Sequence, residues 1–489
     1  MRMTPDQQAP ASRHASLSLW DAVSIIVGIV VGVSIFKAPS IVFANVPTPL
    51  EGLAAWVFGA TIALCGALTY AELATMHRAA GGEYVYLTRA YGRWLGFLFG
   101  WAQLTGVFSG SIAQMAYVFA DYARHWQSAA AGVSEQSHES GAWIAVAVIL
   151  VMTGVHICGV RTGKTVQNIL TVVKVAGLGA LLIVGFSSTA PQAVSDIPAE
   201  IRGPGFGLAM ILVLYAFGGW NDSVFVATEV RERERNVPRA LVLGLAIVAT
   251  LYLLVNLALL KGLGFEATRT SDAPAWDLIE NASVLSPAAQ QTGARAIGLL
   301  VMISAVGAVH GLIFTGSRLY AALGRDHSIF KLLGHWHPVT GSPVWSLSAQ
   351  GLLAVLLTLA VGTDTGRWIV DRAATGLGGS PIPWSDYGGG FETLVAGTAP
   401  VFWWFFCLSG LSLFVFRLRQ PATERPFRVP LFPIVPLVFC LSSAWMFWSS
   451  VTYAGWLTLI AVVPLTCGLP LYLVSKRATH LRQSEIEQT

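Results

Sequence analysis

The chain has 489 residues, of which 54% are hydrophobic and only 11% are charged, and its formal net charge is +4. Soluble domains carry about a quarter charged residues, so this composition excludes an ordinary soluble protein. The few charges are confined to short segments, and the apolar runs between them are about 20 residues long, which is the length that an α-helix needs to cross a bilayer.

In chain order, a polar tail at residues 1–16 is followed by twelve apolar runs and a second short tail at 476–489. We expect the first run to be a membrane span rather than a cleaved signal, because it exceeds the usual apolar length of a signal and lacks a small-residue cleavage site. The sequence predicts an all-α membrane protein with 12 transmembrane helices, near residues 17–43, 51–76, 94–120, 141–159, 165–187, 206–229, 240–262, 295–322, 343–361, 393–417, 431–450 and 454–475.

The basic residues predict which helix ends face the cytoplasm. With the N-terminus inside, the inner segments hold 21 of the Lys and Arg residues and the outer loops hold 7. Cytoplasmic loops of membrane proteins accumulate positive charge. We therefore expect both termini in the cytoplasm and the protein in the plasma (inner) membrane. The same rule accounts for the net positive charge, so no nucleic-acid partner is expected.

The connections between the runs offer no separate soluble domain and no disulfide framework. The largest outer connections lie near 263–294 and 362–392, and the second is expected to be either a structured flap or a loose loop. All five cysteines fall within or at the ends of apolar runs, which argues against a disulfide-linked outer partner. They are Cys65, Cys158, Cys407, Cys440 and Cys467.

Two spans are interrupted by glycines at corresponding places. The first is interrupted at 28–36 and the sixth at 215–222, and each opens a possible unit of five helices. Five is odd, so the second unit must enter the membrane from the opposite side. Such matched interruptions indicate an inverted-repeat transporter and mark its binding site. We predict two repeats, 17–187 and 206–417, followed by two extra helices within 431–475.

A helix that unwinds inside the membrane exposes backbone groups that lipid cannot satisfy, so it must line a cavity. There, a half-helix N-terminus favours a carboxylate, whereas a half-helix C-terminus favours an ammonium group. Two facing breaks thus make a pocket for an α-amino acid. Gly28 and Gly32 alone also fit a small-residue packing face, but the polar residues beside Gly218 and Gly219 favour the broken-helix interpretation.

Several polar residues within the apolar runs are candidate site residues. Lys174 lies about nine residues into its run, which favours a functional role over snorkelling to the surface. Lys37 faces either the site or a wet outer vestibule. His310 is either a proton relay or a structural histidine. Ser111 and Gln114 either line the pocket or join helices by hydrogen bonds.

No chemistry beyond binding is indicated. The segment 159–165 resembles a phosphate-binding loop but is one residue short and has no preceding strand. The charge run 229–239 is expected to be a solvated inner loop. We find no metal-ligand cluster and no nucleophile–base pair, so the sequence predicts neither an enzyme nor a cofactor.

Short motifs recur in a fixed order, and each is weak alone but specific in combination. Besides the first-span glycines they are Gly81-Gly82-Glu83-Tyr84-Val-Tyr86, Gly100-Trp101, Val166-Gln167-Asn168 with Lys174, Phe217-Gly-Gly-Trp-Asn221 with Glu229 and Asn236-Val-Pro238-Arg239, Gly316-Ser-Arg318-Leu-Tyr320, Arg325-Asp326 and Ser342-Pro343. From Ser18 to Arg477 the chain resembles the amino acid–polyamine–organocation (APC) superfamily of transporters, and within it the L-type (LAT) branch.

This resemblance implies a LeuT-like core of two inverted five-helix repeats plus two extra helices. It also implies roles for eight residues, and Ser111 is a ninth candidate from the sequence itself. Backbone N–H groups of the first break bind the substrate carboxylate, and carbonyls of the sixth span bind the ammonium, with an aromatic gate and a polar pocket residue nearby. A lysine stands where sodium-coupled relatives bind an ion, which implies transport without sodium. The matching residues are Gly32, Val33 and Ser34; Tyr215 (also the gate), Ala216 and Gly218; Asn221; and Lys174, with Ser111 added as a candidate wall residue.

The chain departs from the family in three places. Where relatives read Gly-Ser-Gly it has Gly32-Val33-Ser34, and the lost glycine restricts the backbone of the expected carboxylate site. His310 stands where relatives often carry asparagine. The loop after the third span lacks the cysteine by which animal L-type proteins join a heavy chain, so no such partner is expected.

These observations predict a sodium-independent secondary transporter that works by alternating access, by exchange or coupled to protons. Neutral L-amino acids are the expected cargo, because no acidic residue is firmly placed in the predicted pocket. The alternatives are a carrier of cationic amino acids or polyamines, and a transport-inactive amino acid sensor of the same fold.

Overall fold

The computed structural model describes residues 18–76, 82–131, 138–158, 164–190, 205–221 and 230–488. Within these ranges every regular element is a helix, which confirms the predicted all-α class. The first half contains α1 (Leu19–Val30), α2 (Ser34–Ala44), α3 (Pro49–Met76), α4 (Gly82–Tyr91), α5 (Arg93–Ala102), a π-helical turn (Gln103–Val107), α6 (Phe108–Ala131), α7 (His138–Ile157) and α8 (Lys164–Ser187).

The second half begins with a short helix and ends with a long one. It contains α9 (Phe206–Ala216), α10 (Arg233–Gly262), α11 (Phe265–Thr270), α12 (Pro274–Glu280), α13 (Pro287–Asp326), α14 (Val344–Gly362), α15 (Asp364–Gly376), α16 (Gly390–Arg419), α17 (Ile434–Ala454) and α18 (Leu459–Gln488). Short 3₁₀ turns lie at Ser328–Phe330, Trp384–Tyr387 and Gly455–Thr458.

In the described part of the chain, eight helical stretches are long and apolar enough to cross a membrane, namely Pro49–Met76, Arg93–Gln127, Glu139–Ile157, Arg233–Gly262, Pro287–Asp326, Val344–Gly362, Gly390–Arg419 and Ile434–Lys476. The last of these takes in both runs predicted within 431–475, and Gly455 turns the chain between them at φ +50°. Shorter apolar helices occupy the first, fifth and sixth predicted spans, namely Leu19–Gly28, Ser34–Ala44, Val172–Ser187 and Phe206–Ala216.

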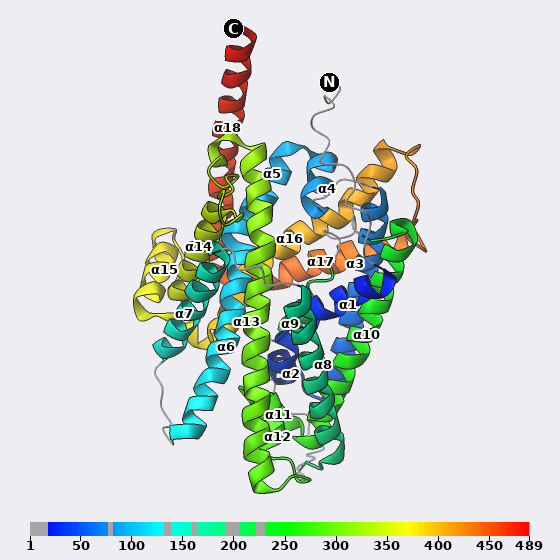
Figure 1. The fold of residues 1–489 in the computed structure, drawn as a ribbon, viewed down its shortest axis with the longest axis vertical. Helices are drawn as coiled ribbons and strands as arrows, with labels where there is room; N and C mark the ends of the chain where they lie inside the picture. The colour runs from blue at the N-terminus through cyan, green and yellow to red at the C-terminus, as the bar shows by residue number, and fades with distance from the viewer. Residues whose placement is uncertain are drawn as a thin grey trace.

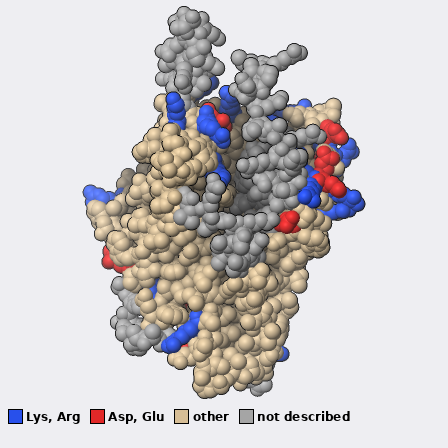
Figure 2. Space-filling view, viewed as in Figure 1, with Lys and Arg blue, Asp and Glu red and all other residues tan. Residues whose placement is uncertain are grey.

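The short helices and the charged side chains occupy different parts of the molecule. α1, α2 and α9 lie near its middle, whereas α11 and α12 lie at one end and α4 lies at the other (Figure 1). Figure 2 shows that most charged side chains visible on this face gather at the end where α4 lies, and that the opposite half is largely uncharged. A polar end beside an apolar body suits a protein held in a bilayer.

The helices approach one another closely where glycines replace larger side chains. A Cβ atom on Gly244 of α10 would lie 2.7 Å from a side-chain atom of Ile26 in α1, and one on Gly59 of α3 would lie within 2.3 Å of Val213 in α9. Small residues at such contacts let membrane helices pack backbone to backbone. Both half-helices are therefore packed tightly against α3 or α10.

The two long connections that the sequence predicts on the outer side are structured. Residues 263–294 contain α11 and α12. Residues 362–392 contain α15, whose Asp371 carboxylate accepts hydrogen bonds from the backbone of Ile382 (2.8 Å) and from the indole of Trp384 (3.0 Å). Of the two alternatives for this segment, the structured flap is the one observed.

At the end where α4 lies, a buried carboxylate joins two helices and a loop. Glu72 of α3 is fully buried, and its oxygens accept bonds from Arg417 of α16 at 2.9 and 2.6 Å. The backbone N–H of Val429 donates a third bond at 2.7 Å, and Arg425 lies 3.5 Å away. A two-point bond to arginine is both strong and directional, so this Glu72 cluster fixes α3 to α16.

Candidate substrate-binding site

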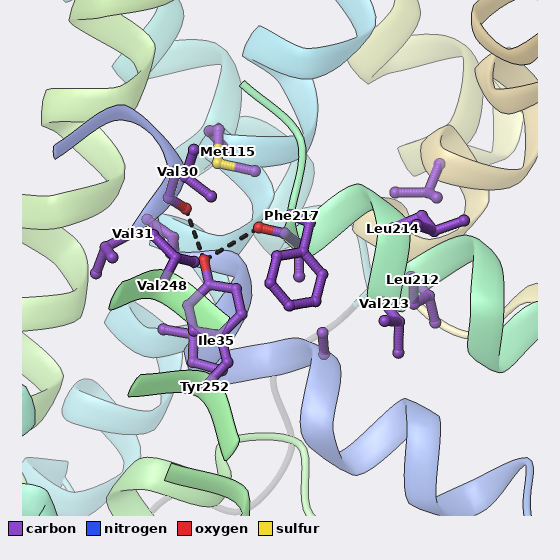
Figure 3. Close-up of a cluster of buried hydrophobic side chains, with 14 of the residues drawn as sticks. Val30, Val31, Ile35, Met115, Leu212, Val213, Leu214, Phe217, Val248 and Tyr252 are labelled. Atoms are coloured by element: carbon purple, nitrogen blue, oxygen red, sulfur yellow. Dashed lines mark hydrogen bonds between the residues drawn. The ribbon is translucent and has the colours of Figure 1, made fainter. Parts of the chain in front are cut away.

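The breaks in the first and sixth predicted spans lie close together, and one tyrosine contacts both. α1 ends at Val30, α2 begins at Ser34, and α9 ends at Ala216. The hydroxyl of Tyr252 in α10 lies 2.6 Å from the carbonyl oxygen of Val30 and 3.0 Å from that of Ala216 (Figure 3). These carbonyls are among the helix-end groups that have no partner within their own helix, so Tyr252 stabilises both ends at once.

Glycines permit the chain to leave the helical path at these points. The N–H of Gly32 turns back to the carbonyl of Val30 at 2.7 Å. Gly219 adopts φ +97°, in the region that side chains with a Cβ rarely enter. A Cβ on Gly218 would lie 2.9 Å from the carbonyl oxygen of Tyr215. The local sequence therefore dictates both interruptions.

The breaks bring helix ends of opposite polarity together. α1 and α9 both present their C-terminal ends, whose free carbonyls carry partial negative charge. α2 presents its N-terminal turn, whose free N–H groups carry partial positive charge. A small zwitterion placed between them would meet N–H groups at its carboxylate and carbonyls at its ammonium.

A cavity of about 330 Å³ lies beside the breaks. Its wall comes from α1, α2, α4, α5, the π-helical turn, α6, α8, α9, α13 and α16. The side chains are mostly apolar or aromatic with a few polar groups, as in most small-molecule sites. They include Phe99, Phe108, Met115, Ile211, Phe402 and Trp403, together with the small residues Gly307, Ala308 and Gly311.

The structure brings eight of the nine candidate residues to this wall, namely Gly32, Val33, Ser34, Ser111, Lys174, Tyr215, Gly218 and Asn221. The ninth, Ala216, does not line the cavity, and its carbonyl oxygen is engaged by Tyr252 instead. The segment 222–229, which contains Asp222, lies outside the described residues.

Lys174 carries a charge deep in the wall. Its side chain belongs to α8, lines the cavity, and is only 6% exposed. Among the described residues it has no ion-pair or hydrogen-bond partner. A buried ammonium without a protein partner makes the cavity attractive to an anionic group.

Two glutamine oxygens add polar capacity to the same wall. Gln114 donates to the hydroxyl of Thr398 at 3.2 Å, but its own side-chain oxygen and that of Gln103 are buried without a partner in the described structure. Gln103 begins the π-helical turn, where its carbonyl accepts a bond from Tyr320 at 3.1 Å. Such turns often occur at functional sites.

Glu83 is a wall residue that the sequence reasoning did not place in the site. It is 5% exposed, lines the cavity, and accepts a 2.6 Å bond from the hydroxyl of Tyr70. The premise that the pocket holds no firmly placed acid is therefore wrong. The signal was present in the motif 81–86, but only the folding of α4 against α3 brings this glutamate to the cavity.

The remaining candidates lie away from the cavity wall. His310 stacks on His156 of α7 with ring centroids 4.3 Å apart. Lys37 belongs to a cluster of charges beyond Tyr215. Within the described ranges, no group of three or more His, Cys, Asp or Glu side chains is placed to hold a metal.

Comparison with known proteins identifies the family of the chain. Residues 17–469 match the family described as amino acid permease. The chain is 28% identical over 471 residues to a b(0,+)-type amino acid transporter 1 of Mus musculus, covering 95% of this chain and 88% of that protein. It is 24% identical over 467 residues to the serine/threonine exchanger SteT of Bacillus subtilis (strain 168), covering 94% and 97%. It is 26% identical over 479 residues to the large neutral amino acids transporter small subunit 2 of Mus musculus, covering 94% and 80%.

Proposed function

Since the chain belongs to the amino acid permease family of the APC superfamily, and is thus a membrane transporter of amino acids rather than an enzyme, we propose that its cargo is neutral L-amino acids and that it works without sodium. The cavity between the two broken spans is the proposed site. The meeting of one helix N-terminus with two helix C-termini supports binding of a zwitterion there, and the mostly apolar wall of the cavity supports a neutral side chain.

In the proposed complex, the substrate carboxylate binds the N–H groups of Gly32, Val33 and Ser34 at the start of α2, and the N–H of Gly32 leaves the carbonyl of Val30 to do so. The ammonium binds carbonyls at the end of α9, from Tyr215 and Gly218. The carbonyl of Ala216 belongs to the same set, since an oxygen that accepts one bond from Tyr252 can accept a second from the ammonium. The aliphatic or aromatic side chain then points into the apolar part of the cavity, beside Ser111 and Asn221.

Lys174 is proposed to take the place of a bound cation. Its ammonium supplies a fixed positive charge beside the first break, where a sodium-coupled carrier would need an ion. Burial at 6% exposure and the lack of a described partner support this role. A cation that belongs to the protein needs no ion from solution, so substrate movement would not depend on sodium.

For the whole chain we propose twelve spans, with two inverted five-helix repeats and two extra helices. A bundle of spans 1, 2, 6 and 7 would rock against spans 3, 4, 8 and 9 to give alternating access. Both termini would lie in the cytoplasm of a plasma (inner) membrane, in accord with the basic residues. The missing cysteine after the third span speaks against a disulfide-linked heavy chain.

The test is uptake of labelled leucine, alanine and serine into liposomes that contain the purified protein and an unlabelled mixture of neutral amino acids. We expect uptake by the wild type and loss of uptake in Gly32→Val, whose side chain would enter the break. Gly154→Val is the matched control, because a Cβ at Gly154 meets no atom within 4 Å. Equal uptake by both variants would contradict the site.

Glu83 favours a second candidate function. An acid in the wall suits a substrate with a cationic side chain, so a carrier of cationic amino acids or polyamines is the alternative. Uptake of labelled arginine or putrescine in place of leucine would support it. Binding of amino acids without any exchange would support a third alternative, a sensor.

A further inference from the structure

A second and larger cavity, here called the vestibule, lies next to the substrate cavity. It has a volume of about 1010 Å³ and is lined by charged side chains from α2, α6 and α16 and from the connection between α11 and α12. Val395 of α16 lines both this vestibule and the substrate cavity. The partition between the two spaces is therefore only one side chain thick at that point.

Lys37 stands at this partition and is surrounded by oxygen atoms. Its ammonium lies 3.4 Å from Asp121 of α6, 3.4 Å from Glu392 of α16 and 3.3 Å from the carbonyl oxygen of Asp272. The side chain of Lys37 is only 6% exposed, whereas the two carboxylates are 14% and 15% exposed. A lysine that was merely wetted by a vestibule would not be buried among three oxygens from three other segments.

The neighbours of these charges tie the same helices together a second time. The carbonyl of Phe36, next to Lys37, accepts a 3.2 Å bond from Tyr122, which is next to Asp121. The ring of Phe391, next to Glu392, meets the ring of Tyr215 edge to face at 5.9 Å. The chain neighbours of the charged residues thus make uncharged contacts of their own: the neighbour of Lys37 contacts that of Asp121, and the neighbour of Glu392 contacts Tyr215 of α9.

We propose that Lys37 is the latch of an outer gate. Its ammonium holds α2 against α6 and α16, while Phe391 holds α9 through Tyr215, so that both half-helices are fixed as long as the outer path is closed. Opening requires the Lys37 contacts to break together with the aromatic one. This inference rests on the proposed transport cycle, because a latch matters only where the two half-helices move.

The geometry favours a contact that breaks readily. Charge-assisted bonds normally measure 2.7–2.9 Å, whereas all three contacts of Lys37 are longer. Asp121 is in addition shared with Arg124, which contacts its other oxygen at 2.9 Å. When Lys37 leaves, Asp121 keeps a cationic partner, and Glu392 lines a cavity wide enough for water.

The test measures access to the substrate cavity from outside. Ala399→Cys places a reporter thiol in α16 that lines the substrate cavity but not the vestibule. A membrane-impermeant maleimide added to the outer face reacts with this thiol only when the gate opens. The parent chain without the new cysteine gives the background from the five native cysteines.

We expect labelling of the reporter to become about tenfold faster in Lys37→Met, because loss of a charged contact of this kind shifts an equilibrium by about that factor. Lys37→Arg should retain most of the protection. Lys261→Met is the matched control, since Lys261 lies at the end of α10 just before α11, is exposed, and among the described residues its ammonium bonds the carbonyl of Phe186.

Glu392→Gln provides a second measurement that leaves Lys37 and Asp121 in place, and it should accelerate labelling in the same direction by a smaller factor. Rates that are equal in Lys37→Met, Lys261→Met and the parent reporter would overturn the latch. If Lys37→Met does not fold, unchanged labelling in Glu392→Gln overturns it instead. The assay uses no substrate, so this failure is distinct from a failure of the proposed cargo.

Discussion

Two buried charge clusters bind helices together, one toward each end of the molecule, and they are built differently. The Glu72 cluster surrounds one carboxylate with arginine and backbone donors at 2.6–2.9 Å. The Lys37 cluster surrounds one ammonium with three oxygens at 3.3–3.4 Å. The first cluster joins α3 to α16, whereas the second joins α2 to both α6 and α16.

The two clusters differ in contact distance and in the kind of buried ion, which indicates that they have different functions. A carboxylate that is fully buried and held at two points by Arg417 is costly to separate. An ammonium that shares its partners and borders a large cavity can exchange them for water. We infer that the Glu72 cluster is a permanent anchor, and that the Lys37 cluster is a contact to be broken and remade.

The largest expected effect tests the anchor. Glu72→Gln leaves Arg417 and Arg425 without their buried counter-charge, so we expect a loss of about 3–5 kcal/mol in the free energy of unfolding. The melting temperature of the protein in detergent measures this. A variant as stable as the wild type would show that the Glu72 cluster is not an anchor.

The next largest effect is expected for Tyr252, which contacts both helix breaks. Tyr252→Phe removes the hydroxyl from the carbonyls of Val30 and Ala216. The carbonyl of Val30 keeps its bond from the N–H of Gly32, whereas that of Ala216 loses the bond from Tyr252, at a cost of about 1–3 kcal/mol. We expect a lower melting temperature and slower leucine uptake. Tyr472→Phe, in a half-buried position on α18, is the control. Equal effects of the two variants would remove Tyr252 from the site.

The latch should be less important for stability than the anchor. Lys37→Met is expected to change the free energy of unfolding by only about 1 kcal/mol, because its partners border a large cavity and Asp121 retains Arg124. The melting temperature and the thiol-labelling rate are measured on the same sample. A loss of stability as large as that of Glu72→Gln would make Lys37 a second anchor rather than a latch.

The smallest effect concerns a histidine at the anchored end. His327 follows α13, contacts Ser475 at 3.2 Å, and packs against Phe97, and burial lowers its pKa below the usual value of 6.5. The folded state therefore disfavours the proton, so this contribution to stability is present above pH 6.5 and is lost as the pH falls below it. We expect the melting temperature to fall less between pH 7.5 and 5.5 in His327→Gln than in the wild type.

The sequence predicted those features of the molecule that have a local cause. The glycines near Gly32 and Gly218 stand at matching places in the two halves, and polar residues follow the second set, so the two breaks were predictable. The apolar runs likewise predicted the helical class. Positions whose importance depends on distant partners were not predictable. Glu72 and Arg417 are 345 residues apart, and Tyr252 contacts Val30 across 222 residues.

Three residues show why the candidate site was only partly predictable. Ala216 is expected to bind substrate, but the bond from Tyr252 on another helix to its carbonyl could not be predicted from the local sequence. Glu83 enters the wall only because α4 folds back against α3. The sequence left Lys37 open between a site residue and a wet lysine, and its burial depends on Asp121 and Glu392, which lie on two other helices.

The central claim is that a zwitterion crosses the membrane between broken helices with Lys174 in place of a cation. The most direct test is exchange of labelled leucine in proteoliposomes, measured with sodium and with sodium fully replaced by choline. The account predicts the same initial rate in both solutions. A rate that falls to background without sodium would contradict it.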